Sequence, residues 1–290
     1  MRWRGRNTSS NIQDRRGAAG YRGSRTTRHV SGIGGLGLLA ILIVGAFLGV
    51  DVTPLLQGGG GMGSLTEQSA PSGPNQINDS QEEFVAVVLR ETETVWSDIF
   101  ARSGYTYEEP TLVLFEGGTT SGCGYARSAM GPFYCPADQN IFLDMDFFRV
   151  MQQDLGSQGE FAQAYVIAHE VGHHVQDQLG LLGKVNERRS SVSRAEANAL
   201  SVRIELQADC YAGLWARDAA SGLELTEDDI RSALDTAARI GDDALQRAQG
   251  GQVVPDSFTH GTSAQRQRWF DTGFRTGDPA ACDTFATDAL

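Results

Sequence analysis

The sequence predicts an α+β fold, mostly helical with a small β-sheet, preceded by one transmembrane helix. Two long stretches, 158–179 and 193–219, carry apolar residues at helical spacing. Two short apolar runs, Thr111–Phe115 and Asn140–Asp144, are instead typical of buried strands. The segment 30–50 contains no charged residue and is rich in Gly, Leu, Ile and Val, which indicates a membrane span.

The segments before the folded domain are predicted as follows. Residues 1–29 are polar and basic, without apolar periodicity, and predict a disordered cytoplasmic tail. Residues 30–50 can cross a bilayer, and the Arg residues before them orient that end toward the cytoplasm. A cleavable signal peptide is the alternative, although no clear A-x-A site follows. Residues 51–78 predict a flexible Gly/Pro linker, so the folded domain is expected at 79–290.

The domain is expected to begin with a helix capped by Asn78 or Asp79 and apolar at helical spacing as far as Phe100. The two strands named above enclose the segment 117–136, which is predicted as a loop or hairpin.

The first long helix should stop at Gly180. A Gly-containing turn should then lead to the second long helix. Shorter helices are predicted at 227–249 and 263–272.

The net charge of −12 argues against nucleic acid as a partner. The basic residues of the N-terminal segment hide a still more acidic remainder. Phosphate contacts need Lys and Arg, so such a domain binds nucleic acid poorly. Solubility is the simpler explanation of the charge.

The four cysteines all follow the apolar segment, and an even number in an exported domain indicates two disulfides. Cys123 and Cys135 bracket a Gly/Pro-rich stretch, so a local link is one possibility, which would leave Cys210 with Cys282. Sequence alone does not choose among the three pairings. A cysteine zinc site is disfavoured because no C-x-x-C pair is present.

The stretch His169-Glu170-Val171-Gly172-His173 carries the strongest chemical signal. Residues four apart lie on one face of a helix, so His169 and His173 can hold one metal ion, and zinc suits such imidazole pairs. Glu170 can reach a water on that metal. Gly172 costs about 1 kcal/mol relative to Ala, which predicts that another element passes close by. The alternative is a solvated helix turn.

A catalytic zinc needs a third protein ligand, and Glu205 on the second long helix is the candidate. Asp209, one turn further on, can accept a hydrogen bond from a liganding histidine. His174 and His260 are rival ligands, and an ordinary solvated acidic helix face is the alternative explanation.

H-E-x-x-H followed by E-x-x-A-D resembles the gluzincin metallopeptidases, and the chain looks most like the neutral zinc metallopeptidase family. The resemblance covers nearly the whole chain apart from the linker. It implies a zincin-like, small gluzincin domain that holds Zn²⁺ through His169, His173 and Glu205. The matching segments are Trp3–Arg6, Asp14–Gly17, Gly131–Pro136, the two motifs above with Cys210–Gly213, Thr259–Gly261 and Cys282–Phe285.

A second similarity is to membrane-bound CAAX-protease-like and heat-shock metallopeptidases, which carry T-H-P with a later Arg. Thr259-His260 and Arg266 fit this spacing, although Gly261 replaces the proline. The similarity implies that His260 and Arg266 stabilise the oxyanion, where such donors are worth roughly 3–4 kcal/mol each. Arg268 competes for the Arg role, and a surface or helix-capping histidine is the alternative for His260.

The sequence therefore predicts a membrane-anchored zinc endopeptidase that acts on peptides or proteins, with Glu170 as general base. Its predicted place is the cell membrane, single-pass, with a cytoplasmic N-terminus and an extracytoplasmic catalytic domain. The strand at Ile141–Leu143 is the candidate edge for substrate. The alternatives are a non-catalytic, zinc-holding membrane-tethered binding protein and a zinc hydrolase of a non-peptide amide.

Overall fold

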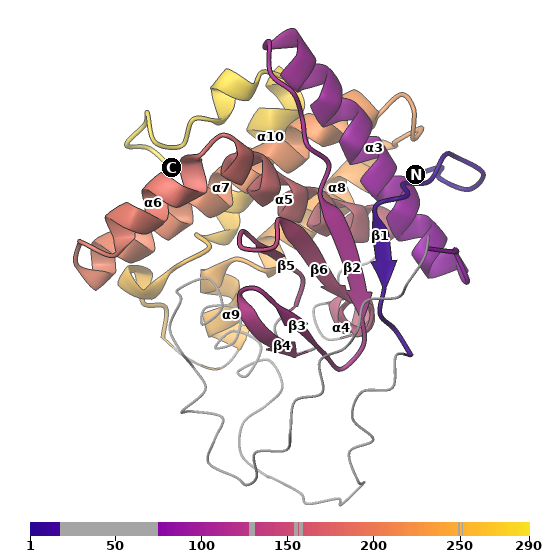
Figure 1. Cartoon of the computed structure of the whole chain (residues 1–290). Helices are drawn as coiled ribbons and strands as arrows, with labels where there is room; N and C mark the ends of the chain where they lie inside the picture. Colours follow the sequence, from indigo (N-terminus) through magenta and orange to yellow (C-terminus); the bar gives the residue numbers. More distant parts are fainter. Residues whose placement is uncertain (18–74, 128–130, 154–155, 157–158, 249, 251) are drawn as a thin grey trace, which may run out of the picture.

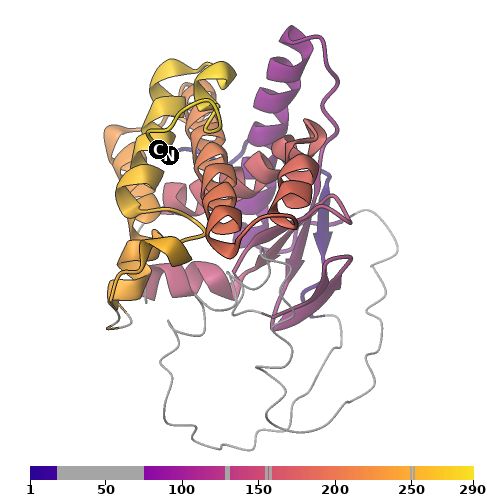
Figure 2. The ribbon, with the colours of Figure 1, turned by 90° about the vertical axis from the view of Figure 1, so that its left-hand side faces the viewer.

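In the computed structural model, a body of helices packs against a small mixed sheet (Figure 1). It describes residues 1–17, 75–127, 131–153, 156, 159–248, 250 and 252–290. Figure 2 shows the helices of the C-terminal half on one side and the strands on the other. The described part is therefore an α+β fold, as predicted.

The main sheet has the strand order β1-β2-β6-β5. β1, β2 and β6 run parallel, and β5 is antiparallel to β6. The predicted strands β2 and β6 are confirmed, but β6 lies between two neighbours, so the prediction that Ile141–Leu143 forms an edge is wrong. The edge on that side is β5. The bounds are β1 Ile12–Asp14, β2 Thr111–Phe115, β5 Phe133–Cys135 and β6 Asn140–Asp144.

Both faces of this sheet are covered, which explains the unbroken apolar runs in β2 and β6. Leu112 and Leu114 belong to the large core shared with the helices. Val113 and Phe115 point to a second, smaller core beneath a hairpin of β3 (Gly118–Ser121) and β4 (Gly124–Arg127). The disulfide Cys123–Cys135 joins this hairpin to β5, as predicted.

The helices are α3 Ser80–Arg102, α4 Asp146–Gln153, α5 Glu160–Gln178, α6 Leu181–Arg189, α7 Arg194–Ala219, α8 Glu227–Arg239, α9 Asp242–Ala248 and α10 Ser263–Thr276. Two 3₁₀ helices, Pro255–Ser257 and Pro279–Cys282, follow α9 and α10. Asp79 caps α3 by accepting two backbone N–H bonds, and Ser193 caps α7 in a reciprocal capping box with Glu196. These caps fix the entry of the two longest helices.

Two expectations about the helices were wrong. The predicted turn after α5 is α6, which begins directly after Gly180, a left-handed residue with φ of 69°. The single helix expected at 227–249 is broken between α8 and α9. A Cβ at Gly241 would lie 2.4 Å from the backbone N of Ser263, so the chain there passes too close for any larger residue.

α7 and α10 cross in direct backbone contact. A Cβ at Gly213 would lie 2.0 Å from the carbonyl oxygen of Phe270, and one at Gly273 would lie 1.9 Å from that of Cys210. The predicted disulfide Cys210–Cys282 closes the same region, with the two Cα atoms 5.6 Å apart. The crossing holds α10 firmly against the helix that carries Glu205.

Residues 1–17 are part of the fold, contrary to the expected disordered tail. Trp3 is buried and meets the ring of Phe84 edge to face, with centroids 5.4 Å apart. The backbone N–H of Arg2 donates to Leu223, and that of Ser9 donates to Ala86. β1 completes the sheet beside β2.

This packing overturns the predicted localisation. One membrane span within 18–74 would put residues 1–17 and the rest of the fold on opposite sides of a bilayer, whereas β1 and β2 share one sheet. The prediction of a cytoplasmic N-terminus with an extracytoplasmic catalytic domain is therefore wrong. The membrane helix predicted at 30–50 and the boundaries around it lie outside the described residues. Among the helices that are described, none combines the length and apolar character needed to cross a membrane.

The helix crossing gives a stability prediction. Gly273→Ala should lower the free energy of unfolding by about 2–3 kcal/mol or more, because its Cβ would overlap the α7 backbone. Gly183→Ala on α6 is the matched control, since a Cβ there meets nothing within 4 Å and the helix should gain about 0.5–1 kcal/mol. Urea unfolding measures both, and equal stability of the two variants would contradict the close crossing.

Candidate metal centre and active site

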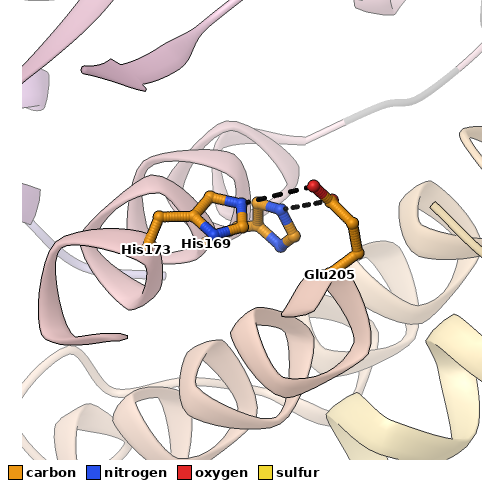
Figure 3. A group of neighbouring side chains, drawn as sticks. All are labelled: His169, His173 and Glu205. Carbon is orange, nitrogen blue, oxygen red and sulfur yellow. Dashed lines mark hydrogen bonds and ion pairs between the residues drawn. The ribbon is translucent and has the colours of Figure 1, made fainter. Parts of the chain in front are cut away.

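Two neighbouring helices bring the three predicted ligands together. His169 and His173 lie on α5 and Glu205 lies on α7, and one ligand atom from each lies within 4.8 Å of the others (Figure 3). His169 Nε2 is 3.2 Å from Glu205 Oε2, and His173 Nε2 is 3.6 Å from Glu205 Oε1. All three side chains are buried. Two imidazoles and a carboxylate therefore converge on one point.

Gly172 allows this convergence. A Cβ at Gly172 would lie 3.2 Å from both the Cα and the carbonyl oxygen of Ala208. This is tighter than an ordinary van der Waals contact, so a larger residue would push α7 away. The close approach expected from the glycine between Glu170 and His173 is confirmed.

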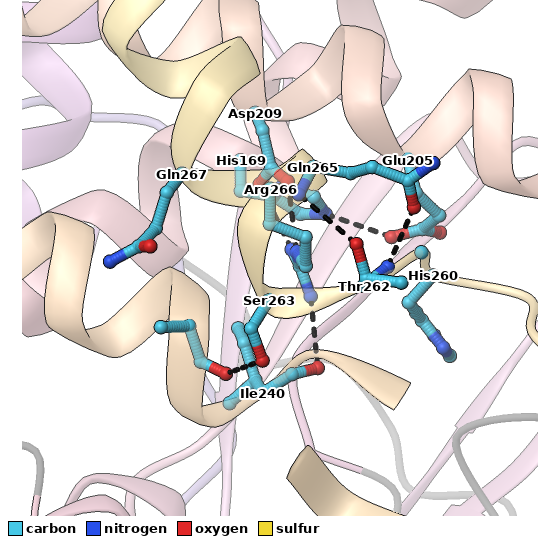
Figure 4. Close-up of polar contacts among 12 residues, drawn as sticks. His169, Glu205, Asp209, Ile240, His260, Thr262, Ser263, Gln265, Arg266 and Gln267 are labelled. Atoms are coloured by element: carbon cyan, nitrogen blue, oxygen red, sulfur yellow. Dashed lines mark hydrogen bonds and ion pairs between the residues drawn. The ribbon is translucent and has the colours of Figure 1, made fainter. Parts of the chain in front are cut away.

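Asp209 holds the ring of His169 from behind. Its Oδ1 lies 2.9 Å from His169 Nδ1 and accepts a hydrogen bond from Arg266 Nη2 (Figure 4). The same oxygen accepts a hydrogen bond from the hydroxyl of Tyr165. Arg266 Nε donates to the other oxygen at 2.8 Å. With Nδ1 protonated and bonded to Asp209, His169 presents Nε2 as a ligand.

Gln176 does the same for His173, and sequence reasoning missed it. Its Oε1 lies 2.8 Å from His173 Nδ1, and its amide donates to the carbonyl of Ile204 and to the side chain of Gln207. Its position, three residues after His173 on the same helix, was the available signal. Both liganding rings are thus fixed by buried partners.

Burial and paired charges set the protonation of these groups. Burial alone would raise the pKa of Asp209, but the charge of Arg266 and the contact with His169 outweigh it and lower that pKa to about 2. Burial lowers the pKa of His169, but Asp209 and Glu205 raise it by more than this, so that it reaches about 10. His173 lacks the Asp209 partner, and burial lowers its pKa to about 4. The histidine beside Asp209 is therefore the one that carries a proton until a cation replaces it.

Glu170 differs from the other carboxylates. It is buried, and its pKa is raised to about 7, chiefly because burial disfavours the charged form. Its Oε2 has no hydrogen-bond partner among the described residues. A carboxyl group with this pKa, one residue from a liganding histidine, can both take and give a proton near neutral pH.

The group fits a zinc ion. Glu205 Oε1 is also buried without a hydrogen-bond partner in the described part of the chain. An orphaned carboxylate oxygen costs free energy that a bound cation would remove. Two histidines and one glutamate are a known ligand set of catalytic zinc, which leaves a fourth position open.

The other candidates lie around this group. His260 is buried, and the charges of Glu205 and Asp242 raise its pKa against the effect of burial. Its backbone N–H and those of Thr259 and Gly261 all donate to Asp242 Oδ2, which holds the loop before α10 in place. His260 therefore lies within electrostatic reach of Glu205 but outside the group of three.

The two arginine candidates separate clearly. Arg266 is buried and held by Asp209. Asp209 contacts Nδ1 of His169, whereas Glu205 contacts Nε2, so Arg266 lies behind the imidazole ring. Arg268 is exposed and donates to the carbonyl of Leu290, away from the site. His174 contacts the carbonyl of Glu108 and the hydroxyl of Tyr134, so it flanks the centre as expected.

A cavity of about 790 Å³ opens beside His173. The β3–β4 hairpin and β5 form one wall, and α6 with the first half of α7 forms the other. One of the three grouped residues, His173, thus lines a space large enough for a side chain of a bound ligand.

Two helix-borne histidines, a glutamate from a second helix and a neighbouring buried carboxylate form the arrangement that is typical of zinc hydrolases with an H-E-x-x-H helix. The chain matches the family described as "Putative neutral zinc metallopeptidase" over residues 1–285 and belongs to it. The predicted family is thereby confirmed, and its name implies zinc and suggests a peptidase.

The chain is similar to "Uncharacterized protein YpfJ" of Escherichia coli K12, with 47% identity over 287 residues that cover 98% of this chain and 99% of that protein. It is also similar to "Uncharacterized protein Rv2575" of Mycobacterium tuberculosis H37Rv, with 44% identity over 209 residues, 68% of each chain. No solved structure gives a significant match.

Gln176→Met should weaken zinc affinity about 10–100-fold, because His173 loses the partner that fixes its ring. Gln178→Met is the matched control on the same helix. In the described structure the Gln178 side chain donates to the backbone carbonyl of Glu108 and to none of the three grouped residues. Competition with a zinc chelator measures both dissociation constants. An unchanged constant in Gln176→Met would show that this contact does not orient the ligand.

Arg266→Met should lower the free energy of unfolding by about 3–5 kcal/mol, because the buried carboxylate of Asp209 would lose its arginine partner. Arg268→Met, which removes an exposed arginine two residues later, should change stability little. Urea unfolding of the metal-free proteins makes the comparison, and equal stability would refute the buried pair.

Proposed function

We propose that this protein is a zinc-dependent endopeptidase in which Glu170 acts as general base. The observation that carries the proposal is a buried carboxylate, Glu170, one residue along α5 from His169 and beside the group of His169, His173 and Glu205. A site that only held a structural ion would have no use for such a carboxylate. The fold proposed with it is a small zincin-like domain of the gluzincin type.

Bound zinc would be held by His169, His173 and Glu205, and it would supply Lewis-acid polarisation and a water of lowered pKa. Glu170 takes the proton of the attacking water and passes it to the leaving amine. Burial keeps bulk water away from the carboxylate.

Other residues position these groups. Asp209 and Gln176 fix the two imidazoles, and Arg266 keeps Asp209 charged. We therefore assign Arg266 a positioning role in place of the oxyanion role that the sequence suggested. His260, held by Asp242, is the remaining candidate to donate a hydrogen bond to the oxyanion.

The substrate strand is proposed to lie along β5. In the described sheet β5 is an edge strand and packs against α5, the helix that carries Glu170. An extended peptide can add to such an edge through main-chain hydrogen bonds. This replaces β6, which has neighbours on both sides.

The Glu170→Gln protein should bind near-stoichiometric zinc, but its peptidase activity should be about 10²–10⁴-fold lower, because an amide of the same shape cannot take a proton. Glu205→Ala should lose most of the zinc, since only two ligands remain. Zinc content and cleavage of an unfolded protein should be measured on the same samples, with Glu160→Gln as an exposed control on the same helix.

Equal activity of Glu170→Gln and the unaltered protein would rule out the general base. If all forms hold zinc and none cleaves a peptide bond, the binding-protein alternative is favoured. Hydrolysis of small amides without cleavage of peptides would favour the non-peptide hydrolase.

A further inference from the structure

The cavity beside His173 has mainly apolar walls near the metal-binding group. Phe133 and Tyr134 of β5, Leu182 of α6 and Ile204 of α7 line it and are themselves buried. These side chains form a surface that an apolar side chain of a ligand would cover favourably.

The charged side chains that line the cavity have one sign. Arg189 and Arg194 line it, and none of its described lining residues is Asp or Glu. The chain as a whole has 36 acidic and 24 basic residues, so this local balance opposes the overall one. A negative group on a ligand would be attracted here, and a positive one repelled.

Arg189 is held in place toward the site. Its Nη1 donates to Asn186 Oδ1 at 3.0 Å, and the side chain is half-buried at the end of α6. Burial lowers the pKa of Arg189, and the negative charge of Glu205 opposes this shift. The guanidinium of Arg189 is therefore within electrostatic reach of Glu205. A guanidinium stays charged in proteins, so the cavity wall keeps a fixed positive charge.

Asn198 gives an independent sign of a polar ligand. It lines the cavity and is 5% exposed, and its Oδ1 has no hydrogen-bond partner among the described residues. Its Nδ2 donates to the carbonyl of Asp256, which orients the amide. A buried acceptor without a partner loses free energy unless an N–H group of a ligand reaches it.

We propose that this cavity selects peptides in which an apolar side chain is accompanied by an acidic residue, and that it rejects basic ones. The apolar side chain packs on Phe133, Leu182 and Ile204, and the acidic residue faces Arg189 and Arg194. Asn198 accepts a peptide N–H group. The inference rests on the proposed peptidase and names its substrate class.

The test uses the full-length, zinc-loaded protein and a peptide set built around a central Leu. Each neighbouring position is changed in turn to Glu, Gln or Lys, and kcat/KM is measured for every peptide. At one position, Glu should exceed Lys by about fivefold or more, and the ratio should shrink as salt is raised. No preference at any position, or a preference for Lys, would overturn the proposal.

Variants assign the preference to the cavity. The double variant Arg189→Gln/Arg194→Gln should bring the Glu-to-Lys ratio close to one, and Arg189→Lys alone should keep most of it. Arg188→Gln is the matched control, because it removes the same charge from an exposed neighbour that does not line the cavity. A ratio that survives the double variant would place the selectivity elsewhere.

Binding separates this inference from the proposed activity. The same labelled peptides are titrated into zinc-loaded Glu170→Gln protein with fluorescence anisotropy as the readout. Suppose that the unaltered protein cleaves no peptide, that the Glu peptide nevertheless binds more tightly than the Lys peptide, and that the double variant abolishes this difference. The endopeptidase proposal then fails and the cavity proposal stands. Cleavage without an acidic preference overturns the cavity proposal alone. Absence of both binding and cleavage overturns both.

Discussion

The contact between α5 and α7 at Gly172 and Ala208 is the constraint on which the centre depends. The backbones approach so closely there that a Cβ on Gly172 would already be crowded. Only at this separation do two residues of α5 and one of α7 reach a common point. Because the ligands sit on helices and not on loops, their spacing follows from the helical repeat.

The same contact forces charges into the protein interior. Glu205, Asp209 and Arg266 are buried together, and one cation does not balance two carboxylates. A proton on His169 reduces the imbalance, as its raised pKa indicates. Binding of a divalent cation would remove that proton and supply the missing charge, so metal affinity and folding are coupled.

Much of the centre could be predicted because it follows local repeats. The spacing of His169 and His173 is one helical turn, and Glu205 with Asp209 repeats the pattern on a second helix. β2 and β6 were visible as apolar runs because both of their faces are covered. Gln176 was missed because its role depends on which ring nitrogen it meets, and the sequence does not show this.

Features that depend on distant parts of the chain were predicted poorly. Strand order decides that β6 is internal, and the decisive neighbour β5 is too short to carry a pattern. α6 is a short, mostly polar helix with Gly183 inside it, so neither periodicity nor composition marked it. The basic residues near the N-terminus suggested a solvated tail, yet Trp3 is buried and β1 pairs with a strand far along the chain.

The pairing of β1 with β2 also affects how the protein folds. Ile12 pairs with Leu112, so β1 leaves the ribosome long before its partner has been made. Before β2 has been made, β1 has no sheet to join. After that, the edge of β2 stays unpaired until β1 binds to it. Contacts between such distant residues form slowly, because the intervening chain must close into a loop first. We therefore expect the pairing of β1 with β2, rather than the formation of the helices, to limit the rate of folding. The unpaired edge of β2 is open to aggregation until that step is complete.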